Sequence, residues 1–435
     1  MQIFKERPHI TLTVLFLLLT SLLLLSSCSR KETIKKEITF IMWGAAVEKK
    51  QMDNWLKDFE IKNPNIKVNC ILASPNYTEK VLAMCAGGTP PDVMMVSDCD
   101  LGLISAYAEK GVLAPLDSFI NDPDNEAWKE DIYPIALEAF KYKGHYYGIP
   151  RECNAKVLYY NKDLFDKEGI PYPDESWTWE KLIEVAKKLT KKDERGKITQ
   201  YGLLQIPWEL CSISYGSKFF NEKGEFVFGN EEDNACRKAL SLILHAIKEK
   251  ATPSPITKTS FGWGNEAFFT GKIAMLISGP WTCMQLARKG VPFKWDMTLV
   301  PKGEKRVTDL YVVGYALHKD AKNKQACLKL IKHLTSKEIL KDLAYSGRAF
   351  PSSKEAAKSY YLKDPVYKDV IHKNIPEKSL EYGIEFIRSP YALEIREIIR
   401  RYGESIILHN GEKMEENLIK MNKEINTLLK KYRLK

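Results

Sequence analysis

Ile38-Thr39-Phe40-Ile41-Met42-Trp43 is an apolar stretch, rich in β-branched and aromatic residues and bounded by Gly44, that predicts a β-strand. A helix is predicted next by four apolar residues at helical spacing, Met52, Trp55, Leu56 and Phe59. Alternating apolar residues then predict a strand at residues 66–70, and Asp92-Val93-Met94-Met95-Val96 predicts another. Strands and helices alternate from the start, which is typical of an α/β protein with a largely parallel sheet.

The alternation continues through the second half of the chain. A strand is expected at Val157-Leu158-Tyr159-Tyr160, followed later by a helix that Thr178 caps. Further strands are expected at residues 273–277 and 312–317, and from about residue 365 the sequence predicts helices. The last of these helices has apolar residues that step 4-3-4-3, namely Met414, Leu418, Met421, Ile425 and Leu428. Two heptads are short for a coiled coil, so we expect a terminal helix packed on a domain.

Length and composition exclude several classes of protein. A chain of 435 residues is too long for one ordinary domain and suggests two or three. Hydrophobic residues make up 44% and charged residues 28%, which excludes intrinsic disorder, a collagen-like fibre and a polytopic membrane protein. Lys and Arg exceed Asp and Glu by 66 to 56, and the net charge of +10 is spread along the chain. Because nucleic-acid-binding proteins concentrate their positive charge, no nucleic-acid partner is expected.

The N-terminus has the pattern of an export signal. A short basic start precedes an apolar stretch over residues 10–25, which is too short for a bilayer-spanning helix of about 20 residues and fits a secretory signal. The stretch ends in Leu25-Ser26-Ser27-Cys28, which resembles a bacterial lipobox, although an ordinary signal peptide with a chance cysteine is the alternative. We expect residues 1–27 to be a lipoprotein signal peptide, Cys28 to carry the lipid, with palmitate, and residues 28–36 to be a tether.

The other cysteines show no metal-binding pattern, because none lies in a Cys-x-x-Cys and no His lies at zinc-ligand spacing. They are Cys70, Cys85, Cys99, Cys153, Cys211, Cys236, Cys283 and Cys327. An even number permits disulfides in an exported protein. Several lie in apolar segments such as residues 66–71, so mostly reduced, buried thiols are the preferred interpretation. No metal and no cofactor are expected.

Sequence signatures of enzymes are missing. The chain has no Gly-x-x-x-x-Gly-Lys-Ser/Thr, Gly-x-Gly-x-x-Gly, His-Glu-x-x-His or Gly-x-Ser-x-Gly motif. Counting acidic residues does not exclude the pair of carboxylates that a glycosidase uses. Missing motifs are weak evidence when taken alone, so a surface-anchored glycoside hydrolase stays open as the alternative from another class.

Aromatic residues provide the positive signal, because the chain has nine Trp and 21 Tyr. Trp43 ends the first strand, Trp208 follows Ile206-Pro207, and Trp281 follows Ser278-Gly279-Pro280. Ligands of open α/β sheets bind beyond the carboxyl ends of the strands, where an indole offers a flat apolar face to the C–H face of a pyranose. For a single Trp, core packing and stacking are equally good interpretations. Three Trp at such positions favour stacking on a ligand.

Four segments in this order carry a family resemblance: residues 90–96, 158–165, 177–180 and 271–281, the last ending in Ser-Gly-Pro-Trp. Together they resemble the extracellular solute-binding proteins of sugar-importing ABC transporters, the family that includes maltose-binding protein, over nearly all of residues 37–435. The resemblance implies an α/β fold of two lobes, periplasmic-binding-protein-like and of type II, with a hinge between the lobes. The N-lobe would comprise residues 37–149 and 309–352. The C-lobe would comprise residues 150–308 and 353–435.

The resemblance also implies aromatic contacts with the ligand. Trp281 matches the stacking Trp of the Gly-Pro-Trp turn, and Trp208 falls where the family has an aromatic residue after a Pro. Trp43 lies where the family often has a contact at the end of the first strand. Trp263 has no family counterpart, and core and cleft are equal interpretations for it.

Polar contacts are implied at four further places. Asn154 falls at a ligand contact near the hinge, and Asp98 falls near a sugar contact, with Cys99 or Asp100 as alternatives of register. Gly314-Tyr315 and Arg348 line up with segments that face the cleft, although a surface charge is an equal interpretation for Arg348.

The resemblance implies a monomeric receptor that is not an enzyme and that is anchored by lipid on the outer side of the bacterial cell membrane. It would bind a carbohydrate, which we expect to be an oligosaccharide, between its lobes and deliver it to the membrane subunits of an ABC permease. Arg348 and Arg151 leave open a binding protein for a phosphorylated polyol such as glycerol-3-phosphate.

Overall fold

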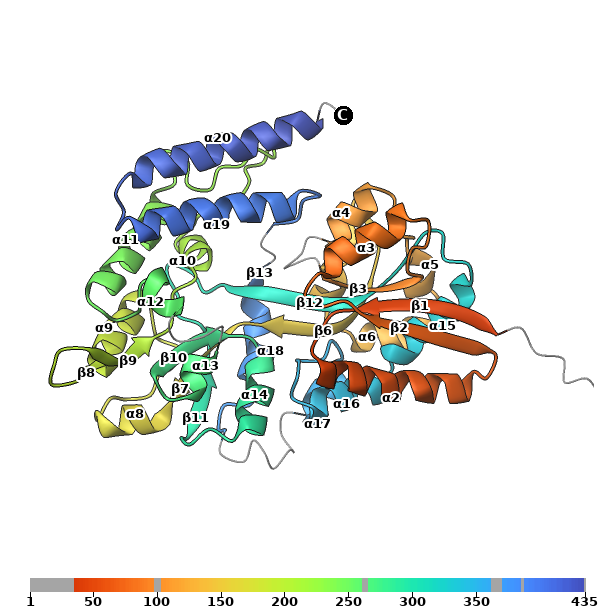
Figure 1. The fold of residues 1–435 in the computed structure, drawn as a ribbon, viewed down its shortest axis with the longest axis horizontal. Helices are drawn as coiled ribbons and strands as arrows, with labels where there is room; N and C mark the ends of the chain where they lie inside the picture. Colours follow the sequence, from red (N-terminus) through yellow and green to blue (C-terminus); the bar gives the residue numbers. More distant parts are fainter. Residues whose placement is uncertain (1–34, 98–102, 260–264, 361–369, 385–386, 434–435) are drawn as a thin grey trace, which may run out of the picture.

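The structure, a computed structural model, describes residues 35–97, 103–259, 265–360, 370–384 and 387–433. Figure 1 shows two α/β lobes side by side, with the long strands β6 and β12 running between them. Each sheet contains strands from distant parts of the sequence, since β12 lies beside β3 in one sheet and β7 lies beside β10 in the other. The two-lobe α/β fold expected from the sequence is confirmed.

The first lobe is built on a mixed sheet with the strand order β13-β12-β3-β1-β2, and β6 pairs with β12. β1 pairs in parallel with β2 and β3, and its residues Ile38, Phe40 and Met42 are buried, as their pattern predicts. The elements of this lobe are β1 (Lys36–Met42), α2 (Ala46–Lys62), β2 (Ile66–Leu72), α3 (Tyr77–Ala86), β3 (Val93–Ser97), α4 (Leu103–Glu109), α5 (Asp117–Ile120), η1 (Pro123–Asn125), α6 (Glu126–Asp131), α7 (Pro134–Glu138), β4 (Lys141–Tyr142), β5 (His145–Tyr146), β6 (Ile149–Ala155), β12 (Thr308–Leu317), α15 (Lys324–Leu334), α16 (Lys337–Tyr345) and α17 (Lys354–Tyr360).

The second lobe is built on a sheet with the strand order β11-β7-β10-β9-β8. Its elements are β7 (Val157–Asn161), α8 (Lys162–Lys167), α9 (Trp179–Leu189), β8 (Lys191–Lys192), β9 (Ile198–Leu203), α10 (Trp208–Ser214), α11 (Asn234–Lys248), α12 (Pro255–Thr259), α13 (Glu266–Phe269), β10 (Ile273–Ser278), α14 (Trp281–Lys289), β11 (Trp295–Thr298), α19 (Ala392–Leu408) and α20 (Met414–Arg433). Between the lobes lie α18 (Ile375–Ser379), η3 (Leu380–Tyr382) and β13 (Gly383–Ile384).

Several predicted elements are confirmed in detail. The Thr178 hydroxyl accepts a hydrogen bond from the Lys181 N–H at 3.3 Å and caps α9, whose apolar face is buried. α20 packs along α19 at the edge of the second lobe (Figure 1), and Leu418, Met421 and Ile425 are fully buried there. The helical prediction for the C-terminal part was wrong at β13, whose two residues pair with β12.

The lobes are joined where β6 passes into β7, with Lys156 as the residue between the two strands. β6 pairs antiparallel with β12, and the register shifts between Val313 and Gly314. The Lys156 N–H donates to the Asp309 carbonyl at 3.2 Å, and the Thr308 hydroxyl donates to the Lys156 carbonyl at 2.8 Å. The two crossing strands are therefore fastened to each other at the edge of the second lobe.

The packing of α17 differs from the predicted lobe boundary at residue 353. α17 contacts α16, and the Lys354 amine donates to the Glu130 carbonyl at 2.7 Å. Both partners belong to the first lobe. β6 also runs past the predicted boundary at residue 149, because it pairs with β12 of the first sheet up to Ala155. We propose that the first lobe includes β6 and extends through α17, and the remaining boundaries stay predictions.

The described cysteines are free thiols, five of them buried and two half-buried. Burial raises the pKa of the Cys70 thiol to about 11 and that of the Cys153 thiol well above its ordinary value. Cys28 and Cys99 lie outside the described residues. Within the described ranges, no helix is both long enough and apolar enough to cross a bilayer.

Candidate functional site

The turn Gly279-Pro280-Trp281 joins β10 to α14 and presents an indole between the lobes. A side chain at Gly279 would place its Cβ within 2.2 Å of the Trp281 ring, so only glycine lets the indole fold back over the turn. The Tyr159 hydroxyl donates to the Gly279 carbonyl at 3.0 Å and fixes the turn to β7. Trp281 is half-buried, and its ring meets the ring of Tyr311 edge-on, with centroids 5.6 Å apart. An aromatic ring at the start of α14 and one from β12 are thus brought together beside the hinge.

Next to Tyr311 lies a hollow of about 400 Å³, which we call the hinge hollow. It is bounded by the crossing strands, the first turn of α10 and one side of α19. Its lining residues are Lys156, Pro207, Glu209, Phe219, Asp309, Leu310, Tyr311, Ile387, Leu393, Arg396, Glu397, Ile399 and Arg400. Three basic side chains (Lys156, Arg396 and Arg400) and three acidic ones (Glu209, Asp309 and Glu397) are among them, so the hinge hollow carries little net charge. Its volume is in the range of about 300–1,000 Å³ that is typical of small-molecule sites.

The floor of the hinge hollow is an ion pair beside an aromatic ring. The Lys156 Nζ lies 2.5 Å from an Asp309 carboxylate oxygen and 5.2 Å from the centre of the Tyr311 ring. Burial alone would lower the pKa of Lys156, but Asp309 and Tyr311 more than offset it and raise this pKa above its ordinary value. The amine therefore stays charged, and it offers N–H donors next to the Asp309 acceptor.

Glu209 stands in the first turn of α10 and adds a second carboxyl to the hinge hollow. Burial raises its pKa to about 7, and the nearby Asp309 acts in the same direction. Its own backbone N–H, Lys156 and Arg396 oppose this rise. A carboxyl of this kind can donate as well as accept hydrogen bonds near neutral pH.

The first lobe contributes the ends of β1 and β3. Trp43 follows β1, is half-buried, and packs edge-on against Tyr77 with ring centroids 4.9 Å apart. The Tyr77 hydroxyl donates to the Met95 carbonyl of β3 at 2.5 Å, so Trp43 rests on a ring that is itself anchored in the sheet. β3 ends at Ser97, which pairs with Val313 of β12. Asp98, with Cys99 and Asp100, lies outside the described residues, and so does Trp263.

Trp208 lies in the core of the second lobe. It is only 7% exposed, and its ring centroid is 5.2 Å from that of Phe228. A Cβ on Gly403 of α19 would lie 2.8 Å from the indole, which shows how closely the ring packs on that helix. Its neighbours Pro207 and Glu209 line the hinge hollow, whereas Trp208 is not among the lining residues. This position favours core packing over the predicted stacking on a ligand.

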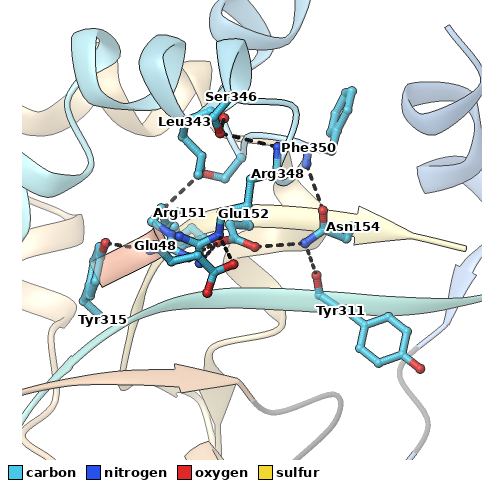
Figure 2. Close-up of polar contacts among 12 residues, drawn as sticks. Glu48, Arg151, Glu152, Asn154, Tyr311, Tyr315, Leu343, Ser346, Arg348 and Phe350 are labelled. Carbon is cyan, nitrogen blue, oxygen red and sulfur yellow. Dashed lines mark hydrogen bonds and ion pairs between the residues drawn. The ribbon is translucent and has the colours of Figure 1, made fainter. Parts of the chain in front are cut away.

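Asn154 and Arg348, both predicted to bind ligand hydroxyls, instead engage protein groups (Figure 2). The Asn154 amide donates to Glu152 at 3.2 Å and to the Tyr311 carbonyl at 3.4 Å, and its oxygen accepts from the Phe350 N–H at 2.8 Å. Arg348 pairs with Glu48 at 3.0 Å and with Glu152 at 3.4 Å. Figure 2 shows the Tyr311 ring pointing away from this cluster, so these side chains do not line the hinge hollow.

Gly314 and Tyr315 also have structural roles. A Cβ on Gly314 would lie 2.2 Å from the Ile149 carbonyl oxygen, so the close pairing of β12 with β6 requires glycine there. Tyr315 is fully buried, and its hydroxyl accepts from Arg151 Nη1 at 3.2 Å. The structure thus places both residues inside the hinge rather than on a surface that a ligand can reach.

Sequence reasoning missed the polar residues of the hinge hollow, Lys156, Glu209, Asp309 and Arg396. Lys156 directly precedes the predicted strand at residues 157–160, and Asp309 lies three residues before the predicted strand at residues 312–317. Nearness to the start of a strand was the available signal for both. Glu209 directly follows Trp208, and Arg396 lies on a surface helix, where a charged residue is ordinary. Among the residues that the structure describes, no group of His, Cys, Asp and Glu is arranged to hold a metal ion.

A family model described as "Bacterial extracellular solute-binding protein" matches residues 45–341. The chain belongs to this family. It is therefore a solute-binding protein with the type II periplasmic-binding-protein fold and not an enzyme, and the hydrolase alternative is set aside. Family membership also makes it an extracellular protein that works with an ABC transporter.

Known members show how similar this solute-binding protein is to its relatives. The ABC substrate-binding protein Lmo0181 of Listeria monocytogenes, solved in complex with cycloalternan, has 29% identity and a TM-score of 0.79, with 91% of this chain and 99% of that chain covered. An uncharacterized ABC transporter extracellular-binding protein of Pyrococcus horikoshii is 26% identical over 80% of this chain and 78% of its own length. The maltotriose-binding protein of Pyrococcus abyssi is 23% identical over 77% of this chain and 74% of its own.

Proposed function

We propose that this solute-binding protein binds a neutral oligosaccharide between its lobes and delivers it to an ABC permease, while a lipid on Cys28 holds it at the cell membrane. The observation that carries the proposal is the Trp281–Tyr311 aromatic pair beside the charge-balanced hinge hollow. A related protein solved in complex with cycloalternan and another named for maltotriose support the choice of ligand class. The ligand cleft would consist of the hinge hollow, Trp281 and the ends of β1 and β3.

The chemistry of this cleft suits a sugar. Aromatic rings offer apolar faces to the C–H groups of a pyranose, and large rigid rings dominate the binding energy of well-packed sites. Lys156, Asp309 and Glu209 offer donors and acceptors to hydroxyl groups at the floor of the hinge hollow. Closure of the lobes would remove water from these groups, and the permease would recognise the closed shape.

A phosphorylated polyol is disfavoured by the state of the two arginines that suggested it. Arg151 is fully buried and pairs with Glu152 and Tyr315, and Arg348 is paired with two carboxylates. A phosphate would have to displace these partners. In the hinge hollow, three cationic side chains face three acidic ones, so at most one positive charge is left for a phosphate when Glu209 is protonated.

The proposal is tested by ligand binding to the parent protein and to Trp281→Ala. Cycloalternan, maltotriose and glycerol-3-phosphate are titrated by calorimetry, and we expect binding of at least one of the two oligosaccharides and none of glycerol-3-phosphate. Trp281 is half-buried and follows the turn between β10 and α14, so part of its ring is accessible to a ligand. Its removal should weaken oligosaccharide binding by about 30-fold, which corresponds to the loss of roughly 2 kcal/mol at a binding hot spot. The melting temperature without ligand should change little.

Trp128→Ala is the matched control, because this half-buried Trp packs against Phe119 in the first lobe and does not line the hinge hollow. It should bind as the parent does. Tight binding of glycerol-3-phosphate would contradict the choice of a neutral sugar. A low melting temperature for Trp281→Ala with unchanged affinity would show that the Trp281 ring stabilises the core and does not bind the ligand.

Anchoring by lipid is tested with Cys28→Ala in the full-length chain. Without the thiol no lipid can be attached, so the variant should be unprocessed or released into the medium while the parent fractionates with membranes. The measurement is the distribution between membrane and soluble fractions, together with the mass of the N-terminal peptide. A variant that is still cut before residue 28 and remains as firmly membrane-bound would refute the lipobox.

A further inference from the structure

The first turn of α2 is connected to the linker before Phe350 through Glu48. One oxygen of its carboxylate accepts from the Ala45 N–H at 2.8 Å, and the other lies 3.0 Å from Arg348 Nε. Gly44 has φ +141°, and a Cβ there would lie 2.0 Å from the Glu48 carboxylate. Glycine therefore lets the segment after Trp43 close over Glu48. The position of Trp43 in the proposed cleft thus depends on where Glu48 is held.

Arg348 continues this connection to the hinge. Arg348 is only 7% exposed, and its guanidinium also lies 3.4 Å from Glu152 of β6. Glu152 pairs in turn with the fully buried Arg151. Figure 2 shows these side chains converging between β6 and the helices of the first lobe. Two buried cations and two anions thus compensate each other, and loss of one partner would leave an uncompensated charge.

The segment around Arg348 is itself fastened to β6 by backbone bonds. The Cys153 N–H donates to the Phe350 carbonyl at 2.8 Å, and the Ser352 N–H donates to the Arg151 carbonyl at 3.0 Å. Asn154 adds the bond from its amide oxygen to the Phe350 N–H. A change in the bend of β6 would therefore move Arg348, and Arg348 would move Glu48.

We infer that Glu48, Arg348 and Glu152 are positioning residues that couple the segment carrying Trp43 to the hinge strand β6. They make the position of the Trp43 segment, which forms the first-lobe side of the proposed cleft, depend on the bend of β6. They do so without contacting the ligand. This coupling exists in the ligand-free protein, and only the ligand-binding test of it rests on the proposed function.

Hydrogen–deuterium exchange on the ligand-free protein tests the coupling with Glu48→Gln. Whichever way the Gln amide is turned, its NH₂ group faces either the Ala45 N–H or the Arg348 N–H, so one contact is lost. We expect exchange to become about tenfold faster in residues 43–48, which corresponds to the loss of one charge-assisted hydrogen bond. If the two segments are coupled, the exchange rate should increase by a comparable factor in residues 151–154 of β6 and in residues 348–352.

Arg348→Lys is the second variant, because a single ammonium group cannot hold both Glu48 and Glu152. It should accelerate exchange at the same two places and remain folded. Asp53→Asn is the control, since it removes a charge from the exposed Lys49–Asp53 pair on the same helix. It should leave both places unchanged. Acceleration confined to the first turn of α2 in both variants would overturn the inference.

The ligand-binding readout uses cycloalternan and maltotriose as probes. Glu48→Gln and Arg348→Lys should each weaken binding about tenfold, and the double variant should be no weaker than the worse single variant, because coupled residues are not additive. Fully additive losses would contradict a shared link. If neither sugar binds the parent protein, the proposed ligand class fails, whereas the exchange experiment still decides the coupling.

Discussion

Trp208→Ala is expected to lower the free energy of unfolding by about 3–5 kcal/mol, the range found when a buried Trp or Phe is truncated to Ala. The ring is 7% exposed and packs between Phe228 and the backbone of α19 at Gly403. Truncation would leave a cavity where α10 meets α19. The indole fills this contact closely, since a Cβ at Gly403 would lie only 2.8 Å from it. Chemical denaturation followed by far-ultraviolet circular dichroism measures the loss.

Trp208→Phe provides the matched comparison, because it keeps an aromatic ring in the same site and should cost clearly less than the Ala variant. Both variants should retain oligosaccharide binding at temperatures where they are folded. An Ala variant that unfolds like the parent but no longer binds sugar would restore the stacking role predicted from the Pro-Trp sequence.

Glu209→Gln is expected to stabilise the protein at pH 8 by about 3 kcal/mol and to change it little at pH 4. The Glu209 pKa is about 7 in the folded protein, against an ordinary value of 4.5, because burial disfavours the carboxylate. Between about pH 4.5 and pH 7, the folded protein therefore binds more protons than the unfolded chain, so the free energy of unfolding falls as pH rises through this window. At about 1.4 kcal/mol per pKa unit, the full loss is about 3 kcal/mol.

The measurement is the free energy of unfolding of the parent and of Glu209→Gln between pH 4 and pH 8. The difference between them should grow across the window and then level off above pH 7. Glu194→Gln, in the exposed turn between β8 and β9, is the control and should follow the parent. A constant difference between parent and Glu209→Gln at every pH would show that this carboxyl is not the group responsible.

The fold could be predicted because its information is local. The apolar run at residues 38–43, the cap at Thr178 and the spacing of Leu418, Met421 and Ile425 each specify an element without reference to the rest of the chain. The Gly-Pro-Trp turn is also local, since the glycine is required by the indole two residues later. Such patterns survive in a single sequence.

The polar part of the site could not be predicted, because its chemistry depends on partners distant in sequence. Asn154 is engaged by Phe350, and Arg348 by Glu48 and Glu152, so two candidates for hydroxyl binding are occupied by the protein itself. Conversely, Glu209 is half-buried in the wall of the hinge hollow, and its raised pKa comes from the loss of water in a place that only the folded protein creates. Trp208 and Trp281 follow a Pro alike, and only tertiary packing distinguishes a core ring from an accessible one.

The docking of α19 and α20 on the second lobe has a consequence for the order in which the protein is made. Residues 156–298 leave the ribosome well before α19, yet the core around α10 and α11 is completed only by Ile395, Ile399, Leu418 and Met421. Until those helices arrive, the nascent chain exposes a large apolar face, and incomplete chains with such faces aggregate. A chain interrupted before residue 392 should therefore depend on chaperones to stay in solution, whereas the complete chain should not.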